Sequence, residues 1–205
     1  MRVYDSSCTR IFLFPMAQKK RFSWQNIVFI VVILLLIIPQ TRTPIQVAIN
    51  KVKVAIFSPS AFAKKDQTQL QSFDYKVSSL EGIPAEVGVG KGKVTFISYW
   101  ATWCPPCIAE LPSIAELYAD YGDKITFLLI TNEDPEVVKK FMTKRELDLP
   151  AVLPAMETPE LLFERSIPTS YIIDQEGNIV VKETGASDWN SDSIRTIIDN
   201  LLTEN

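Results

Sequence analysis

Two cysteines separated by two prolines, Cys104-Pro105-Pro106-Cys107, are the residues whose types and spacing most clearly indicate a chemistry. They follow an apolar run at residues 94–100, typical of a buried strand, and precede a segment with helical spacing. Thiols three positions apart at the start of a helix can close a small disulfide, and the helix N-terminus favours a thiolate on Cys104. This arrangement is typical of a site for thiol–disulfide exchange. The apolar positions that share one face of the predicted helix are Leu111, Ile114, Leu117, Tyr118 and Tyr121.

The chain of 205 residues contains no histidine, and this absence excludes several other kinds of site. Ser-His-Asp and Cys-His nucleophile systems, histidine zinc sites and histidine-ligated haem all require that residue. Ile108 follows Cys107, so the haem-attachment pattern Cys-x-x-Cys-His is excluded as well. The third cysteine, Cys8, is remote in sequence, and the other two cannot form a four-cysteine zinc site alone. We therefore expect no metal and no organic cofactor, with a Cys104–Cys107 disulfide as the redox group.

The residues after the first strand alternate between helix and strand signals. Residues 125–131 form a second apolar run, and helix starts stand at residues 134–136 and 158–159. Residues 169–174 and 178–182 predict two strands that flank a tight turn, hence a hairpin. The order β-α-β-α-β-β-α predicts an α/β fold with a central mixed sheet and helices on both faces. The inward face of the last predicted helix consists of Ile194, Ile197, Ile198 and Leu201.

Five short motifs stand in order between about residues 73 and 203. They are Gly92-Lys93-Val94, Tyr99-Trp100-Ala101-Thr102-Trp103-Cys104-Pro105-Pro106-Cys107, Glu110-Leu111-Pro112, Ile167-Pro168-Thr169 and Ile172-Ile173-Asp174-Gln175-Glu176-Gly177-Asn178-Ile179. With these motifs the chain resembles the thioredoxin superfamily, and within it the membrane-anchored TlpA/ResA-like reductases. The resemblance implies a thioredoxin-like fold, with a central mixed β-sheet flanked by helices, and the activity of a thiol–disulfide oxidoreductase.

The resemblance also implies how the surroundings of the disulfide are shaped. The Ile167–Pro168 peptide bond is expected to be cis and to face the disulfide, so that backbone groups near Thr169 can pair with an extended substrate. An ordinary trans proline that enters a strand is the alternative. Trp103, beside Pro105 and Pro106, is expected to shield the cysteines and to offer a contact surface. The alternative for Trp103 is simple packing.

Glu110 stands three residues after Cys107 and matches the glutamate of ResA-like proteins. One helical turn places it near Cys107, where a partly buried carboxyl would have a raised pKa and could exchange protons with that thiol. Thioredoxin itself has an aspartate six residues before the first cysteine, whereas this chain has Ser98, which cannot accept a proton at neutral pH. We expect Cys104 as the nucleophile, Cys107 as the resolving thiol and Glu110 as its base. An exposed glutamate on the helix surface is the alternative.

The first 65 residues differ in charge from the rest of the chain. They hold ten of the 21 Lys and Arg residues and one of the 24 acidic residues, so the remainder is an acidic domain. Residues 27–38 are all Ile, Val, Leu or Phe, and basic residues 19–21 precede them. Residues 22–39 therefore predict an uncleaved transmembrane signal anchor, with residues 1–21 in the cytoplasm by the positive-inside rule. We expect a single-pass protein of the bacterial inner membrane with its catalytic domain in the periplasm or cell envelope.

Two segments follow the predicted anchor. Residues 40–72 are expected to form an amphipathic segment and a linker, and residues 73–205 the thioredoxin-like domain. A helix that starts near Thr43 would carry Ile45, Ile49, Val52 and Ile56 on one face, and a stalk of no special role is the alternative. Residues 58–72 are expected to be the linker. One alternative is a cleaved signal peptide, but the Ala-Phe-Ala sequence at residues 61–63 lies about 25 residues past the apolar run. Another is a translation start at Met16, which would remove the residues before it.

These observations predict a membrane-anchored enzyme that reduces disulfides of exported proteins, such as apocytochrome c. The resemblance implies a membrane electron donor of the thiol-transfer type. An acidic domain without a basic stripe is a poor candidate for nucleic-acid binding. The alternatives are a disulfide-donating oxidase or isomerase, a copper-binding assembly factor, a peroxidase, and an anchor with a vestigial redox pair. The copper-delivery relatives use a wider Cys-x-x-x-Cys spacing and a histidine, and both are absent from this chain.

Overall fold

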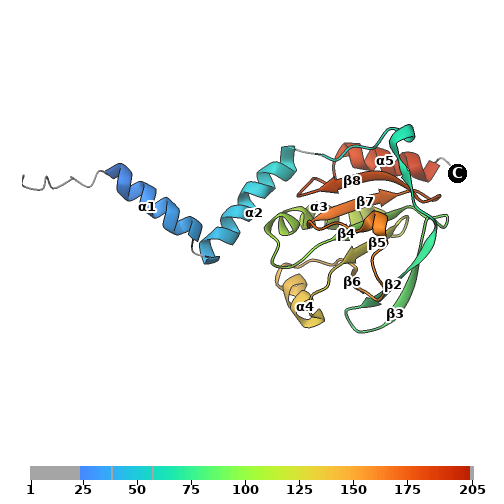
Figure 1. The fold of residues 1–205 in the computed structure, drawn as a ribbon, viewed down its shortest axis with the longest axis horizontal. Helices are drawn as coiled ribbons and strands as arrows, with labels where there is room; N and C mark the ends of the chain where they lie inside the picture. Colours follow the sequence, from blue (N-terminus) through green and yellow to red (C-terminus); the bar gives the residue numbers. More distant parts are fainter. Residues whose placement is uncertain (1–23, 38, 57, 204–205) are drawn as a thin grey trace, which may run out of the picture. The chain divides into compact units, whose positions relative to one another are not determined.

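The computed structural model describes residues 24–37, 39–56 and 58–203. The chain divides into two units, Met1–Ile38 and Pro39–Asn205, which we treat separately. In the first unit the described residues form helix α1 (Trp24–Ile37), and its residues 24–34 are exposed (Figure 1). No helix in the three described ranges is both long enough and apolar enough to cross a membrane. The rest of the predicted cytoplasmic segment and anchor, residues 1–23 and 38, lies outside the described residues.

The second unit begins with helix α2 (Pro39–Ile56), which starts four residues before the start that we expected at Thr43. Pro39 occupies the first helical position, where the missing N–H has no intrahelical partner to lose, and Pro44 lies inside the helix. Of the apolar residues predicted to share one face, Ile49 and Val52 are exposed.

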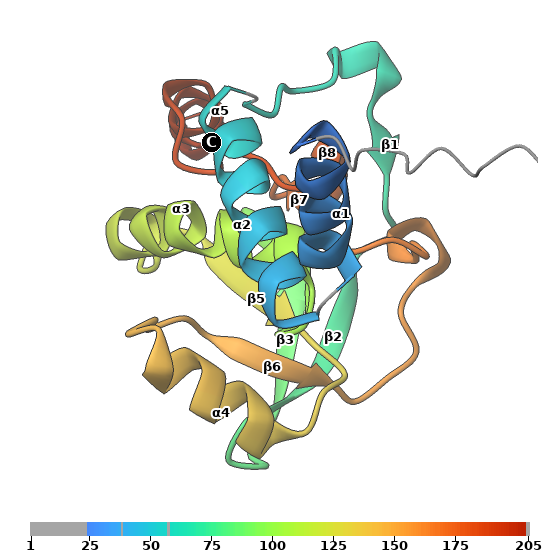
Figure 2. The same cartoon turned by 90° about the vertical axis from the view of Figure 1, so that its left-hand side faces the viewer.

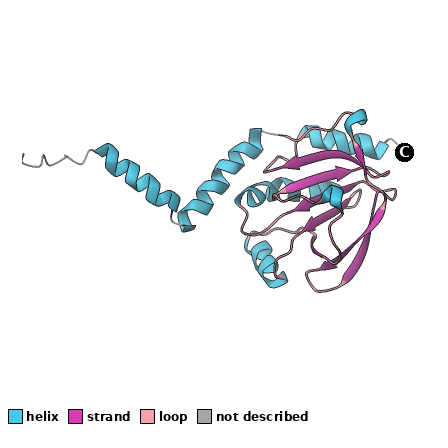
Figure 3. Cartoon of the chain, viewed as in Figure 1, coloured by secondary structure: helices cyan, strands magenta, loops and turns pink. Residues whose placement is uncertain are grey.

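The rest of the second unit is built on one sheet, which has eight strands in the described part of the chain. The strand order is β1-β8-β7-β4-β5-β6-β2-β3. The pairs β4·β5 and β5·β6 are parallel and the other pairs are antiparallel, so the sheet is mixed, as predicted (Figure 3). The strands are β1 (Thr68–Gln69), β2 (Phe73–Ser79), β3 (Pro84–Val89), β4 (Thr95–Tyr99), β5 (Thr126–Ile130), β6 (Ala151–Pro154), β7 (Thr169–Ile173) and β8 (Asn178–Thr184).

Three helices flank this sheet: α3 (Pro105–Tyr121), α4 (Pro135–Lys144) and α5 (Asp192–Thr203). Figure 2 shows all three along the same side of the sheet, whereas we expected helices on both faces. The reason is β6, a strand that the sequence reading missed. Because the sheet continues in one direction from β4 through β5 to β6, two right-handed crossovers place α3 and α4 on the same face. Two 3₁₀ turns, η1 (Lys64–Asp66) and η2 (Glu160–Leu162), complete the described elements.

Two buried apolar clusters lie on the two faces of the sheet, because successive side chains of a strand point to opposite faces. In β4, Phe96 packs with the helices, in contact with the rings of Trp189 and Phe127, and Ile97 packs on the other face. That second face is closed by Leu162 of η2. Full burial of such a side chain stabilises a fold by about 1.5–3 kcal/mol. β4 is therefore held from both faces, and it carries the cysteine loop at its end.

Residues 58–72, which we expected as a linker, run along the edge of the sheet. The backbone N–H of Phe62 donates to the carbonyl of Val180 at 2.8 Å, β1 pairs with β8, and Leu70 is buried. The Leu70 N–H donates to the Gly177 carbonyl at 2.7 Å. Gly177 has φ +92°, and a Cβ there would lie 2.7 Å from the Leu70 carbonyl oxygen, so the turn requires glycine. The segment is thus part of the sheet as well as a connection.

Candidate active site

Cys104 and Cys107 form a disulfide at the start of α3, with their Cα atoms 5.3 Å apart. Cys104 is the N-cap residue, and its Sγ accepts a hydrogen bond from the backbone N–H of Cys107 at 3.3 Å. Both cysteines are buried in this oxidised form, Cys104 at 3% exposure and Cys107 at 0%. The helix begins there because Pro105 and Pro106 occupy its first positions, where the missing N–H groups are not needed. The geometry places the Cys104 sulfur at the positive end of the helix dipole.

The peptide bond between Ile167 and Pro168 is cis, as expected from the sequence. The carbonyl oxygen of Ile167 lies 3.7 Å from Sγ of Cys104, so this turn does face the disulfide. Thr169 begins β7 and is fully buried, with its hydroxyl donating to the Ser166 carbonyl at 2.8 Å. Of the predicted residues of this turn, Ile167 is therefore in contact with Cys104, and Pro168 and Thr169 follow it directly in the chain.

Glu110 lies inside the domain, with 1% of its surface exposed. Its Oε2 accepts hydrogen bonds from the Trp189 Nε1–H at 3.2 Å and from the Ser187 backbone N–H at 3.3 Å. Burial raises the pKa of Glu110 to about 8, against the smaller lowering effect of these two donors. The nearby charge of Glu183 raises the pKa slightly further. The carboxyl is therefore largely protonated at neutral pH. A partly buried carboxyl was expected at this position, and the structure shows an almost completely buried one.

Ser98, at the position of thioredoxin's buried aspartate, lies in β4 and is 1% exposed. A serine hydroxyl does not ionise near neutral pH, so this position supplies no proton acceptor for the cysteines. Glu110 enters the same interior from helix α3, one turn after Cys107.

A second glutamate, Glu133, holds the loop that leads to the cysteines. Its carboxylate accepts from the Thr102 backbone N–H at 2.5 Å and from the Thr102 hydroxyl at 2.7 Å. Glu133 follows β5 and Thr102 follows β4, and these neighbouring parallel strands end at the same edge of the sheet. The sequence reading missed this contact, although an acidic residue just after a buried strand next to the cysteine strand is a recognisable signal.

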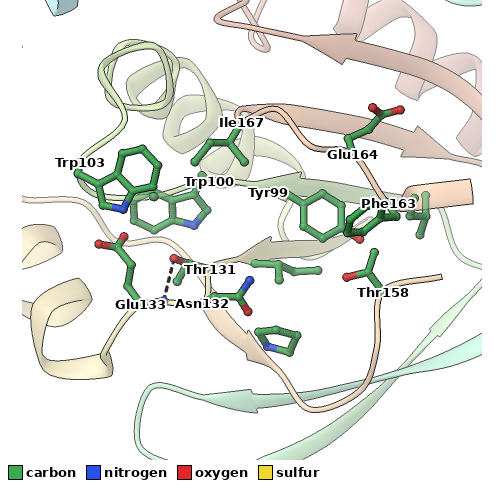
Figure 4. A pocket seen from close by; sticks show the side chains of 14 residues that line it. Tyr99, Trp100, Trp103, Thr131, Asn132, Glu133, Thr158, Phe163, Glu164 and Ile167 are labelled. Atoms are coloured by element: carbon green, nitrogen blue, oxygen red, sulfur yellow. Dashed lines mark hydrogen bonds between the residues drawn. The ribbon is translucent and has the colours of Figure 1, made fainter. Parts of the chain in front are cut away.

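A pocket of about 300 Å³ is lined by Trp103, which precedes Cys104, and by Ile167, whose carbonyl oxygen lies 3.7 Å from Sγ of Cys104 (Figure 4). Trp103 and Phe163 stand on its rim with 68% and 60% of their surfaces exposed, and Ile167, which precedes the cis proline in the chain, also lines the pocket. Tyr99 also lines the pocket; its hydroxyl lies 3.3 Å from that of Tyr75, and burial raises the pKa of Tyr99 well above its ordinary value. The pocket thus combines exposed aromatic surface with polar groups, among them the carboxylates of Glu133 and Glu164, which suits a segment of polypeptide. Pro105 and Pro106 are half-buried beside the cysteines.

Metal ligands do not gather anywhere in the described ranges: they contain no group of three or more His, Cys, Asp or Glu side chains that could hold an ion. The chemistry available at the site is that of a dithiol and a buried acid.

The chain is similar in sequence to a protein family and to individual known proteins. Residues 65–198 match the family model described as Redoxin. A thiol-disulfide oxidoreductase ResA from Bacillus cereus is 32% identical over 131 residues, which cover 60% of this chain and 75% of that protein. The thioredoxin-like protein YneN from Bacillus subtilis is 28% identical over 125 residues, covering 58% of this chain and 74% of that protein.

Among solved structures, a thiol:disulfide interchange protein of the thioredoxin family from Chlorobium tepidum is similar, with a TM-score of 0.52 and 29% identity. The match covers 68% of this chain and 99% of that one. A structure described as a thiol-disulfide oxidoreductase from Bacteroides vulgatus gives a TM-score of 0.52 at 28% identity, with 68% of this chain and 99% of the other covered. The chain therefore belongs to the Redoxin family of the thioredoxin superfamily, and it is a thiol–disulfide oxidoreductase of the ResA type with a thioredoxin-like fold.

Proposed function

We propose that this protein reduces disulfides of exported proteins, with apocytochrome c as one candidate substrate, through the Cys104–Cys107 dithiol. The observation that carries the proposal is the disulfide at the N-terminus of α3 with a buried acid, Glu110, one turn further on. Thiol–disulfide exchange needs an attacking thiolate, a resolving thiol and a place for the proton, and these three residues supply them.

Cys104 is the nucleophile in this proposal. Its thiolate is stabilised by the helix N-terminus and by the Cys107 backbone N–H, which donates to the same sulfur. The thiolate attacks one sulfur of a substrate disulfide, forms a mixed disulfide and releases the other substrate sulfur as a thiolate that takes up a proton. The Cys107 thiolate then attacks Sγ of Cys104, which releases the second substrate thiol and closes the Cys104–Cys107 disulfide.

Glu110 in its ionised form, the minor form at neutral pH, takes the proton from Cys107 before this second attack. Its pKa of about 8 lies close to the ordinary value of a cysteine thiol, about 8.5, so the transfer between them is nearly balanced in free energy. A carboxyl with an ordinary pKa near 4.5 would be a much weaker base for this thiol.

The substrate segment lies, in this proposal, along Ile167, Pro168 and Thr169 and against Trp103, with Pro105 and Pro106 shaping the approach to the cysteines. The exposure of Trp103 and its place on the rim of the pocket support a contact role over simple packing. The Ile167 carbonyl oxygen lies beside Sγ of Cys104. An extended substrate segment that pairs with the backbone at Ile167 would therefore bring its own sulfur close to Cys104.

The test is capture of substrates by Cys107→Ser in the full chain. Without the resolving thiol, the mixed disulfide on Cys104 persists and is visible as a larger species on a non-reducing gel, and Cys104→Ser should give no such species. If Cys107→Ser captures nothing in the cell envelope and Cys104→Ser behaves identically, the exchange mechanism is wrong. If captured proteins are substrates that lack disulfides in the absence of this chain, the protein donates disulfides, which is the oxidase alternative.

We also infer that residues 22–39 are a signal anchor, that residues 1–21 are cytoplasmic, and that the domain at residues 73–205 works in the periplasm or cell envelope, recharged by a membrane thiol donor. The apolar run and the basic residues before it support this. The 14 residues of α1 alone span about 21 Å of the roughly 30 Å of a hydrocarbon core, so the anchor must use flanking residues.

Cys8 provides the topology test. In a Cys104→Ser/Cys107→Ser background, a membrane-impermeant maleimide should label Cys8 only after lysis of spheroplasts, in a protein that sediments with the membranes. Labelling in intact spheroplasts, or a protein that stays in the supernatant, would contradict the anchor.

A further inference from the structure

We propose that Trp189 is a positioning residue for Glu110. Its hydrogen bond to one carboxyl oxygen determines that the other oxygen exchanges the proton with Cys107. The inference rests on the proposed role of Glu110 as the base for Cys107. Trp189 lies 76 residues or more beyond the turn of α3 that it contacts, and no motif identified in the sequence contains it.

The two oxygens of Glu110 have different surroundings. Oε2 accepts two hydrogen bonds, from the Trp189 indole N–H and from the Ser187 backbone N–H, whereas Oε1 is buried and has no hydrogen-bond partner. An oxygen that accepts from two N–H donors is poorly suited to carry a proton of its own. The proton of the neutral carboxyl therefore belongs on Oε1, and Oε1 is the oxygen left free to receive the proton of Cys107.

The orientation of the Trp189 indole is fixed by its surroundings, so that its N–H points at the Glu110 carboxyl. Its backbone N–H donates to the Ser113 hydroxyl at 3.2 Å, and that hydroxyl donates to the Glu110 carbonyl at 2.8 Å. Trp189 is thus hydrogen-bonded to one turn of α3 at two points. Its backbone N–H is bonded to the Ser113 side chain, and its indole N–H is bonded to the Glu110 carboxyl. The indole is fully buried, with its ring edge-to-face with Phe96 at 5.0 Å between centroids. Such packing leaves the ring little freedom to turn away.

The hydrogen bond from Trp189 strengthens when Glu110 becomes charged, because bonds to ionised acceptors are stronger than bonds to neutral ones. The indole therefore stabilises the carboxylate that forms when Cys107 gives up its proton. The charged group that acts on this carboxyl is Glu183 on β8, whose charge acts in the opposite direction to the indole, and Cys107 stands one turn earlier on α3. Loss of the indole N–H should raise the pKa of Glu110 by about one unit.

The experiment compares Trp189→Phe with Trp100→Phe in the full chain. Trp100 is a matched control, since it is also buried but its indole N–H has no hydrogen-bond partner. The titration of Glu110 is followed by the infrared C=O stretch of its protonated carboxyl, identified as the band that Glu110→Gln removes. The second readout is the pH profile of the rate at which the reduced protein reduces oxidised glutathione.

We expect Trp189→Phe to move the infrared midpoint up by about one pH unit and to lower the rate at pH 7 by about tenfold, with recovery at pH 10. Trp100→Phe should leave the midpoint unchanged. Equal midpoints in wild type and Trp189→Phe, or equal shifts in both tryptophan variants, would overturn the role of Trp189 alone. A pH profile of Glu110→Gln that matches wild type would instead overturn the role of Glu110 as a base.

Ser113→Ala keeps the inference testable if circular dichroism shows that Trp189→Phe is unfolded. This variant keeps the indole but releases the Trp189 backbone N–H from α3. The Glu110 midpoint should rise in the same direction, by less than one unit. An unchanged midpoint in a folded Ser113→Ala protein would then count against the positioning role.

Discussion

The buried carboxyl of Glu110 should make the protein less stable as the pH rises, and Glu110→Gln should remove this dependence. Burial raises the pKa of Glu110 from 4.5 to about 8, so between these values the folded state keeps a proton that the unfolded state has released. Because the folded state then binds more protons, the free energy of unfolding falls as the pH rises through this window. The shift of about 3.5 units corresponds to about 5 kcal/mol at about 1.36 kcal/mol per unit.

Glutamine suits this test because its side-chain oxygen can still accept from Ser187 and Trp189 while its amide carries no charge. The assay is urea denaturation of the oxidised full chain, followed by far-UV circular dichroism at pH values from 4.5 to 8.5. Relative to Glu110→Gln, wild type should lose about 4 kcal/mol across that range, because the titration is incomplete at both of its ends. Glu116→Gln, an exposed change on the same helix, should follow wild type. Parallel curves for wild type and Glu110→Gln would refute the assignment of Glu110 as a buried neutral acid.

Three further changes test other parts of the structure. Glu133→Gln weakens the two hydrogen bonds that hold Thr102 and should lower the free energy of unfolding by about 1–2 kcal/mol in urea titrations, whereas no change would mean that this contact is not formed in solution. Trp103→Ala should raise KM for a peptide disulfide about tenfold with kcat little changed, since the exposed ring contacts substrate and not the reacting atoms; a fall in kcat alone would contradict this. Asp134→Ala removes the cap of α4, where the carboxylate accepts from the Glu136 N–H at 2.8 Å, and should cost about 1 kcal/mol, with Asp134→Asn restoring most of it.

The parts of the site that are local in sequence could be predicted, and those that depend on distant residues could not. The Cys104–Cys107 disulfide needs only three residues of spacing and a helix start, and the cis bond at Pro168 was implied by the resemblance of Ile167-Pro168-Thr169 to the motif of thioredoxin-like proteins. The partners of Glu110 are 77 and 79 residues away, and nothing in the sequence around Trp189 marks it as a donor to that carboxyl. The burial of Glu110 could be expected from the sequence, but the two N–H groups that donate hydrogen bonds to its carboxyl could not.

The same distinction holds for the fold. The apolar runs that became β4 and β5 were visible because both faces of these strands are buried. The four-residue strand β6 was missed because it is too short to show a period, and its presence explains why α3 and α4 lie on the same face of the sheet. The hairpin of β2 and β3 was also missed, although Phe73, Tyr75 and Val77 alternate with polar residues in the manner of a half-buried strand.

The direction of electron flow is the central claim, and the equilibrium reduction potential of the Cys104–Cys107 pair in the full chain tests it most directly. The fractions of disulfide and dithiol would be measured in dithiothreitol and glutathione buffers at pH 7. The account predicts a value below about −230 mV, near that of thioredoxin, as expected for a protein that reduces the disulfides of others. A value above about −150 mV, towards that of strongly oxidising exchangers, would mean that the protein introduces disulfides, and the proposed function would be wrong.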